Sequence, residues 1–255
     1  MGSVLLAFSG GVDSTFLLKV LKDTLPKDRF LAITATSATF PKEELAFAKK
    51  IAHDLDVRHK VIRTNELKNK EFLSNTAQRC YFCKKELFLR LEKLAAGDKL
   101  QFVADASTIS DDKDFRPGSQ AKAELGVRSP LKEASFSKED IRKASKALGL
   151  VTWDKPSLAC LASRIAYHVR ISPAILSRIE RGEKFLRGLG FREVRLRHHN
   201  GLCRIEVARR DIPRMVKQYD VVCRGIKRLG YQFVTLDLEG YRMGSMNPAL
   251  PKKAK

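Results

Sequence analysis

The sequence predicts an α/β protein, in which a parallel sheet with helices on both faces is followed by a smaller α+β domain. Two observations support this prediction. In the first 106 residues, short apolar runs typical of buried strands alternate with segments of helical periodicity. After residue 166, the pattern changes to two similar segments that each read helix, glycine, strand. We therefore expect one domain over residues 1–165 and a second over residues 166–255.

The first domain is predicted from the order strand, helix, strand, helix. Parallel strands need such crossover helices, which cover the sheet on both faces. The helix expected near residue 50 places Ala48, Ile51 and Leu55 on one apolar side. Strands are expected over Val4–Phe8, Phe30–Thr36, Val57–Arg63 and Leu100–Ala106, and helices over Ser14–Leu25 and Glu43–Leu55.

A further helix and a loop are expected before the second domain. Ser137 and Asp140 have the spacing of a capping box, which opens a helix that Gly149 ends. Residues Trp153–Arg164 then read as a connecting loop.

The second domain is predicted from an internal repeat. Arg187–Leu196 resembles Lys227–Leu236, since each has a helix end, a glycine and an apolar strand. This pattern indicates a small domain with its own sheet.

Composition restricts the class of protein. No apolar run approaches the roughly 20 residues that cross a bilayer, so we expect a cytoplasmic protein without membrane contact. A formal net charge of +20 favours polyanionic ligands, although charged surfaces also accompany heat stability. Five cysteines in such a chain favour metal or catalytic roles over disulfides.

A glycine-rich turn between a strand and a helix is the most specific feature. It reads Ser9-Gly10-Gly11-Val12-Asp13-Ser14. The glycines let the backbone approach a phosphate, and the N-terminus of the following helix attracts its charge. The turn has neither Walker A nor dinucleotide spacing. An ordinary strand-to-helix turn, with Asp13 as a helix-start residue, is the alternative.

This turn resembles the PP-loop of the ATP pyrophosphatases. The resemblance implies the fold of that group, adenylation of a substrate and release of pyrophosphate. Magnesium would neutralise the phosphate charge. The residues that the resemblance assigns to ATP are Ser9, Gly10, Gly11, Asp13 and Ser14, with Asp13 also catalytic.

Other segments resemble the LarE family, and together they cover nearly the whole chain. That family transfers sulfur to pyridinium-3,5-biscarboxylic acid mononucleotide in the synthesis of the nickel-pincer nucleotide cofactor. The resemblance implies that ATP adenylates a substrate carboxylate and that sulfur, from sulfide or another donor, then displaces AMP. The segments are Arg79–Lys84, Asp114–Gly118, Trp153–Arg164, Val194–Asn200 and Leu238–Asn247.

Cysteines are the candidate sulfur-handling residues. Cys80 and Cys83 are three apart, so in a helix or tight turn their thiols face one side. By itself this pair indicates a metal or cluster site, a redox pair or a coincidence. The resemblance adds Cys160, because one branch of the family has three cysteines and an iron-sulfur cluster. We expect Cys80, Cys83 and Cys160 to bind a [4Fe-4S] cluster, with one iron left open for sulfide.

Two alternatives to the cluster stay open. Another branch of the family sacrifices a loop cysteine, whose position aligns better with Ala159 than with Cys160. A structural zinc would need a fourth ligand that the sequence does not supply. Cys203 and Cys223 fall on apolar faces and are expected in the core.

Arginines are the candidate substrate-binding residues. Arg195 and Arg197 alternate along one strand and so project from one face, where they can hold a phosphate or carboxylate. A solvated strand face is the alternative. The resemblance adds Ser163, Arg164 and Arg242 to this group. His198 and His199 are possible acid–base groups.

Two rival functions share these features. A tRNA-thiolating enzyme would use the same loop and cysteines, but we find no zinc ribbon or other RNA-binding module and do not expect a nucleic acid partner. A non-catalytic nucleotide or iron-sulfur carrier would not need the phosphate loop. The second domain is expected to bind substrate and to form a homo-oligomer.

Overall fold

The computed structural model describes residues 1–113, 117–156 and 159–250. Two compact units are present. The first comprises Met1–Asn69 and Gln78–Leu158, and the second comprises Lys70–Ala77 and Ala159–Lys255. The larger segment of the second unit begins at residue 159, whereas the sequence pattern places the domain boundary after residue 165. Each unit is described below by itself.

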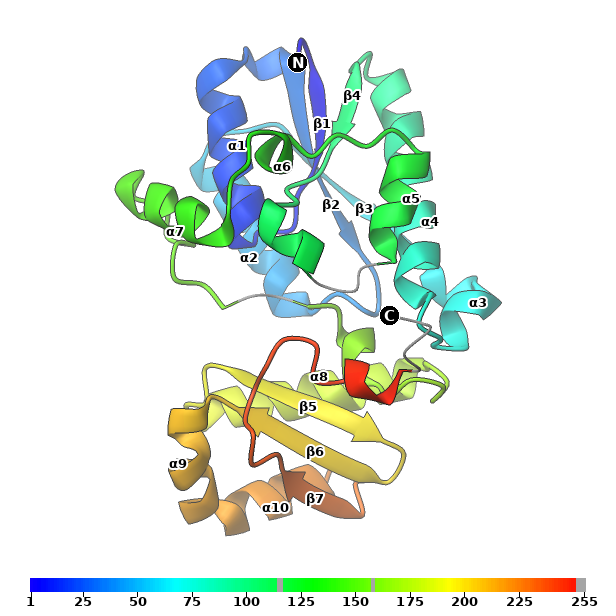
Figure 1. The fold of residues 1–255 in the computed structure, drawn as a ribbon, viewed down its shortest axis with the longest axis vertical. Helices are drawn as coiled ribbons and strands as arrows, with labels where there is room; N and C mark the ends of the chain where they lie inside the picture. Colours follow the sequence, from blue (N-terminus) through cyan, green and yellow to red (C-terminus); the bar gives the residue numbers. More distant parts are fainter. Residues whose placement is uncertain (114–116, 157–158, 251–255) are drawn as a thin grey trace. The chain divides into compact units, whose positions relative to one another are not determined.

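The first unit contains the predicted parallel sheet (Figure 1). Its strand order is β3-β2-β1-β4, with β1 paired to both β2 and β4 in parallel. Because β4 joins β1 on the side away from β2, the strand order reverses between β1 and β4. Ligands of such sheets bind at the carboxyl ends next to this point. The strands are β1 (Val4–Ala7), β2 (Phe30–Thr36), β3 (His59–Arg63) and β4 (Phe102–Ala104).

Helices cover both faces of this sheet, as predicted. Val4 and Leu6 pack with Phe16 of α1 and Ile141 of α7 on one face. The intervening Leu5 packs with α4 on the other face, as strand alternation requires. The helices of the unit are α1 (Val12–Thr24), α2 (Lys42–Asp54), α4 (Arg79–Gly97), α5 (Gly118–Glu124), α6 (Pro130–Glu133) and α7 (Lys138–Ala147).

Several predicted elements have different bounds in the structure. The strand expected over residues 100–106 is only β4, because Asp105 and Ser107 form a local side-chain turn after it.

The capping box of α7 is confirmed: Ser137 Oγ accepts from the Asp140 amide at 3.2 Å, and Asp140 Oδ2 accepts from the Ser137 amide at 3.0 Å. Gly149 follows this helix with a positive φ of 67°.

The second unit contains a smaller mixed sheet, as predicted (Figure 1). β5 and β6 are antiparallel, and β7 adds to β6 in parallel. The sequence repeat corresponds to α8, Gly190 and β5, and then to α10, Gly230 and β7; both glycines have positive φ. The elements are α3 (Lys70–Leu73), α8 (Pro173–Gly188), β5 (Val194–His199), β6 (Leu202–Val207), α9 (Ile212–Lys217), α10 (Tyr219–Lys227) and β7 (Phe233–Leu236).

A short early segment belongs to this second unit. The side-chain amide of Asn75 donates to the carbonyls of Ala166 at 2.8 Å and Val169 at 3.0 Å. Asn75 is fully buried and has a positive φ of 54°. These bonds explain why Lys70–Ala77 clusters with residues 159–250, an association that the sequence pattern did not indicate.

No helix within the described ranges is long and apolar enough to cross a membrane.

Candidate active site

The phosphate loop connects β1 to α1, as the sequence predicts. Gly10 has a φ of +72°, a conformation that side-chain-bearing residues rarely adopt. A Cβ atom at Gly10 would lie 3.0 Å from both Cα and Cβ of Ala48 on α2. Glycine is therefore required at this position for two reasons: its φ is positive, and α2 leaves no space for a side chain.

Hydroxyl groups hold the loop in shape. Ser9 Oγ lies 3.1 Å from Ser14 Oγ, and Ser14 Oγ also donates to the Gly11 carbonyl at 3.2 Å. Gly11 is the N-cap of the 13-residue α1 and has no side chain, while Asp13 lies in the first helical turn. Such a helix start attracts anions through its amide groups and dipole. The glycine cradle and this helix start fit the phosphates of a nucleotide.

Lys155 contacts the phosphate loop from a distant part of the chain. Its Nζ donates to the Gly10 carbonyl at 3.2 Å and to Glu44 Oε2 at 2.7 Å, and it lies 3.5 Å from the centre of the Phe47 ring. Burial lowers the pKa of Lys155, and Glu44 opposes that change. The Lys155 ammonium group is thus held at the Gly10 carbonyl of the phosphate loop.

The cysteines are divided between the two units. Cys80 and Cys83 lie in the first turn of α4, with Cys80 exposed and Cys83 partly exposed. Cys160 is exposed and belongs to the second unit. All five cysteines lie in the described residues, and none forms a disulfide. Within residues 1–113, 117–156 and 159–250, no group of three His, Cys, Asp or Glu side chains is placed to hold a metal ion.

The other two cysteines differ from each other. Cys203 on β6 is fully buried, which raises the pKa of its thiol. Cys223 is only partly buried, which corrects the expectation of a core residue. An apolar face around Cys223 requires one continuous helix, but α9 ends at Lys217 and α10 begins at Tyr219, which is exposed.

Arg195 and Arg197 are both buried on β5, so the alternative of a solvated strand face is wrong. Arg197 donates to Glu206 Oε2 at 2.7 Å and to Ser245 Oγ at 2.9 Å. Arg195 lies with its guanidinium 4.7 Å from the ring centre of Tyr241. Burial, and then the charge of Arg164, lower the pKa of Arg195.

Arg164, in the loop before α8, is a third buried arginine beside Arg195 and Arg197. It is 2% exposed, and its Nε donates to Glu183 Oε1 at 2.9 Å. Its Nη1 donates to Ser163 Oγ at 3.0 Å. Burial alone would raise the pKa of Glu183, but Arg164, Arg195 and the Leu196 amide together outweigh it, so the pKa is lowered. Arg242 forms ion pairs with Glu239 and Asp237 instead.

The two histidines differ from free imidazoles. His198 is buried, with Nδ1 3.1 Å from the Tyr231 hydroxyl, and burial lowers its pKa to about 4. Burial also lowers the pKa of His199. Both rings are therefore neutral near pH 7.

Comparisons with known proteins identify the family. The model of the family described as queuosine biosynthesis protein QueC matches residues 3–87, which include the phosphate loop. The pyridinium-3,5-bisthiocarboxylic acid mononucleotide synthase of Lactiplantibacillus plantarum is 37% identical, over 98% of this chain and 90% of its own. The chain belongs to the LarE family. It has the α/β fold of the PP-loop proteins.

Two uncharacterised proteins are also similar over most of their length. One from Synechocystis sp. is 41% identical, over 97% of this chain and 93% of its own. One from Methanocaldococcus jannaschii is 29% identical, over 94% of this chain and 90% of its own. The similarity to these relatives therefore extends through both units.

Three site residues of this LarE family chain were missed by the sequence analysis. Glu183 and Glu206 are the buried counter-charges of the arginines, and Lys155 supports the phosphate loop. A signal for Glu206 was available. Asn200 and Gly201 form a two-residue hairpin turn, whose register places Arg195 opposite Glu206. Lys155 lies in the Trp153–Arg164 segment that resembles the LarE family, but no sequence signal assigned it to the phosphate loop.

Two predicted segments lie partly outside the described residues. Asp114–Gly118 includes residues 114–116, and Trp153–Arg164 includes residues 157 and 158, none of which is described.

Proposed function

We propose that this chain is an ATP-dependent sulfurtransferase acting on pyridinium-3,5-biscarboxylic acid mononucleotide in the cytoplasm. ATP would adenylate a substrate carboxylate and release pyrophosphate. A sulfur nucleophile would then attack the acyl carbon, so that a C–S bond forms, the C–O bond to AMP breaks, and a thiocarboxylate results. The observation that carries the proposal is the similarity, over 98% of the chain, to a relative named as a pyridinium-3,5-bisthiocarboxylic acid mononucleotide synthase.

The phosphate loop supports the ATP-dependent part of the proposal. Gly10 and Gly11 put no side chains on the loop, so its amide groups can approach phosphate oxygens, and the α1 start favours their charge. Ser9 and Ser14 supply hydroxyls at the same place. Asp13, in the first turn of α1, is the residue that we assign to Mg²⁺. When bound, magnesium would neutralise charge on the phosphates.

The arginine group supports binding of an anionic substrate. Three guanidinium groups, those of Arg164, Arg195 and Arg197, are buried with two carboxylates, those of Glu183 and Glu206. One positive charge is thus in excess, and a substrate phosphate would compensate it through charge-assisted hydrogen bonds. We assign Ser163 to the same subsite because it contacts Arg164, and Arg242 as the family resemblance implies.

We assign sulfur handling to Cys80, Cys83 and Cys160. Two accessible thiols on one helical turn, at a helix N-terminus that favours negative charge, suit the ligands of an iron-sulfur cluster. A [4Fe-4S] cluster with three protein thiolates would keep one iron open for sulfide. The alternative is that Cys160 gives up its own sulfur and becomes dehydroalanine. We favour the cluster because the alternative leaves Cys80 and Cys83 without a role.

Product analysis tests the proposal. Purified protein incubated with ATP, Mg²⁺, sulfide and the mononucleotide should form AMP, pyrophosphate and a thiocarboxylate detectable by mass spectrometry. Asp13→Ala and Ser14→Ala should each reduce AMP formation strongly, because phosphoryl-group chemistry depends on positioning and charge stabilisation. ADP and phosphate as products would contradict adenylation. AMP formation with tRNA but not with the mononucleotide would favour a tRNA-thiolating enzyme.

A further inference from the structure

One face of the sheet in the second unit collects buried nitrogen atoms that lack a hydrogen-bond partner. In the part of the chain that the structure describes, the buried side-chain nitrogens of this kind are Arg197 Nε, His199 Nε2, Arg204 Nε and Arg242 Nη1. Arg197 and His199 alternate along β5, and Arg204 lies directly opposite Arg197 on β6, so these three side chains share one face. Buried donors are costly without an acceptor, so this face is suited to bind one.

Arg242 reaches the same face from the segment that follows β7. Figure 1 shows this segment running back across β6 and β5, and the Asp237 amide donates to the Ile205 carbonyl of β6 at 2.9 Å. Arg204 Nε and Arg242 Nη1 lie 3.6 Å and 3.7 Å from the same oxygen, Asp237 Oδ2. Both distances are too long for a hydrogen bond. The two guanidinium groups therefore come close to each other while these nitrogens keep their donor capacity.

The other nitrogens of Arg197 and Arg204 are held in place by Glu206. This carboxylate is fully buried and accepts from Arg197 Nη2 at 2.7 Å and from Arg204 Nη2 at 3.2 Å. Ser245 Oγ donates to Glu206 Oε1 at 2.7 Å and so fixes the carboxylate in turn. Because a guanidinium group is planar, fixing one of its nitrogens by a charged hydrogen bond also restricts the direction of its Nε.

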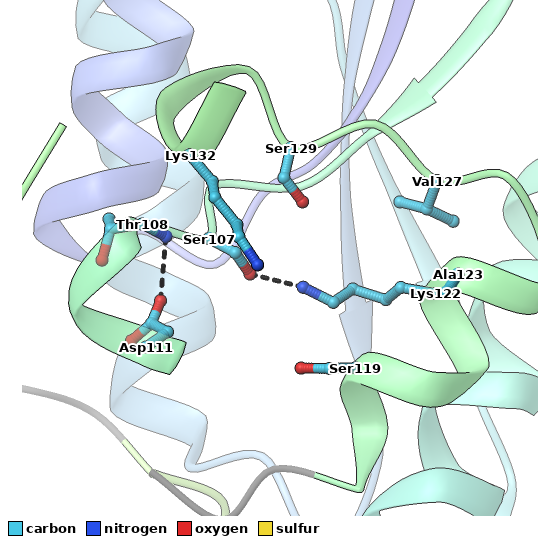
Figure 2. A pocket seen from close by; sticks show the side chains of 9 residues that line it. All are labelled: Ser107, Thr108, Asp111, Ser119, Lys122, Ala123, Val127, Ser129 and Lys132. Atoms are coloured by element: carbon cyan, nitrogen blue, oxygen red, sulfur yellow. Dashed lines mark hydrogen bonds between the residues drawn. The ribbon is translucent and has the colours of Figure 1, made fainter. Parts of the chain in front are cut away.

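A basic pocket in the first unit is different in this respect. Figure 2 shows it between the segment after β4, α5 and α6. The ammonium group of Lys122 in that pocket donates to Ser107 Oγ at 2.6 Å and to Asp105 Oδ2 at 2.9 Å. Lys122 thus has acceptors from the chain itself, whereas Arg204 Nε does not. The contrast favours the face of the second unit as a place for an acceptor from a ligand.

The donors restrict the chemistry of that ligand. Arginine nitrogens are charged donors without acceptor capacity, and their preferred partners are the oxygens of carboxylates and phosphates. The side chains of Arg204 and Arg242 are 27% and 37% exposed, and that of Arg197 is 7% exposed. A ligand would therefore meet Arg204 and Arg242 first. His199 adds no charge near pH 7, because burial and then the charges of Arg204 and Arg197 lower its pKa.

We propose that Arg204 is a further substrate-binding residue, which donates together with Arg197 and Arg242 to an oxyanion group of the mononucleotide. Two groups of that molecule have this chemistry: its phosphate and a ring carboxylate. The identity of the mononucleotide rests on the proposed function, whereas binding of an oxyanion by these arginines does not. Asp237 opposes such binding through its negative charge, although its Oδ1 is occupied by the Glu239 amide at 2.9 Å.

Calorimetric titration of the full chain tests this inference. The ligands are pyridinium-3,5-biscarboxylic acid mononucleotide, nicotinic acid mononucleotide, nicotinamide mononucleotide, which lacks a carboxylate, and nicotinic acid riboside, which lacks a phosphate. Arg204→Gln should weaken binding of the biscarboxylic acid mononucleotide roughly tenfold or more, because a charged hydrogen bond is lost. Arg204→Lys should not restore it, because lysine keeps the charge but not the fork. The matched control is Arg228→Gln, which removes an exposed arginine at the end of α10.

A second variant changes the affinity in the opposite direction. Asp237→Asn removes a negative charge that lies within 3.7 Å of both Arg204 and Arg242 while keeping the shape of the side chain. It should bind the biscarboxylic acid mononucleotide more tightly than the wild type, because the repulsion between the ligand and Asp237 is lost. This variant tests the inference even if Arg204→Gln does not fold.

The ligands distinguish the two oxyanion groups. Weaker binding of both nicotinic acid and nicotinamide mononucleotide by Arg204→Gln, with unchanged binding of the riboside, would assign Arg204 to the phosphate. Weaker binding of the two nicotinic acid compounds, with unchanged binding of nicotinamide mononucleotide, would assign it to the carboxylate. Wild-type affinity of folded Arg204→Gln for every ligand, unchanged affinity in Asp237→Asn, or no binding of any ligand by the wild type would overturn the inference. Arg204-dependent binding without AMP formation would reject only the proposed function.

Discussion

At the scale of single residues, buried arginines and glutamates form the candidate substrate site of the second unit. Arg164 and Arg197 each have a carboxylate within 2.9 Å, in Glu183 and Glu206 respectively. Burying a charge is costly unless it is paired, so these pairs fix the direction of both guanidinium groups. The lowered pKa of Arg195 shows that its charged form is destabilised where it stands. An anionic ligand would remove that penalty, and Arg195 is therefore the most direct test of substrate binding.

Arg195→Ala should weaken mononucleotide binding by about 1.5–3 kcal/mol, the worth of a hydrogen bond to a charged group, and leave ATP binding nearly unchanged. Titration of the variant with each ligand measures this. Arg197→Lys should also bind the mononucleotide poorly, because lysine keeps the charge but not the planar fork, whose two arms reach the Ser163 carbonyl and Glu206. Equal losses for both ligands, or none, would remove these arginines from the substrate site.

Lys155→Met should lower kcat/KM for AMP formation roughly 10- to 100-fold, because the Gly10 carbonyl loses its charged donor and the phosphate loop loses a support. Steady-state kinetics with varied ATP measures the effect, with Lys143→Met as the control. Lys155→Met also leaves Glu44 without its cation. The double variant with Glu44→Gln should therefore regain stability but not activity. Recovery of both would mean that Lys155 only neutralises Glu44.

At the scale of elements, local sequence patterns predicted which strands exist better than they predicted where the strands end or which distant segments pair. Apolar runs predicted the four parallel strands of the first unit. β1 and β2 are apolar because they are buried on both faces, whereas the edge strand β3 is largely exposed. The β4 strand is shorter than predicted, since the apolar run does not reveal that Asp105 turns the chain. The association of Asn75 with residues 165–169 was missed, because a buried amide that bonds distant carbonyls has no periodic signal. Only folding brings these residues together.

The sheet of the second unit should lose stability as the pH falls from about 6.5 to 4. Burial lowers the pKa of His198 on β5 to about 4, so the unfolded chain binds a proton in this range that the folded chain does not. The loss should reach about 3 kcal/mol below pH 4. Urea unfolding followed by circular dichroism at pH 7 and 4.5 measures it.

The control for this effect is His198→Gln, which cannot titrate and should reduce the difference between the two pH values. Glu183 also destabilises the folded protein as the pH falls, but at lower pH. Its pKa is lowered by folding, so its contribution to the free energy of unfolding is lost when the carboxylate is protonated. An unchanged pH dependence in His198→Gln would assign the acid sensitivity to the carboxylates.

At the scale of the whole molecule, the sequence predicted the fold class better than the site. The phosphate loop was found from the sequence because its backbone needs glycines at fixed positions. Arg195 and Arg197, the candidate substrate-binding residues, were singled out because strand alternation puts them on one face. Their carboxylate partners come from α8 and β6 and depend on packing. The three candidate cysteines come from both units, so neither unit alone tests their joint role.

Replacement of Cys80, Cys83 or Cys160 by Ser should each lower the iron and sulfide content of anaerobically reconstituted protein and weaken its brown absorbance. The physical reason is that a hydroxyl replaces a thiolate, the ligand that iron in such clusters prefers. Cys203→Ala is the control for cysteine loss, and Cys223→Ala is a second control on α10; neither should change the iron content. Mössbauer spectra would identify the cluster type. Single-turnover loss of the Cys160 sulfur in iron-free protein, detected as a mass decrease to dehydroalanine, would contradict the cluster and support the sacrificial route.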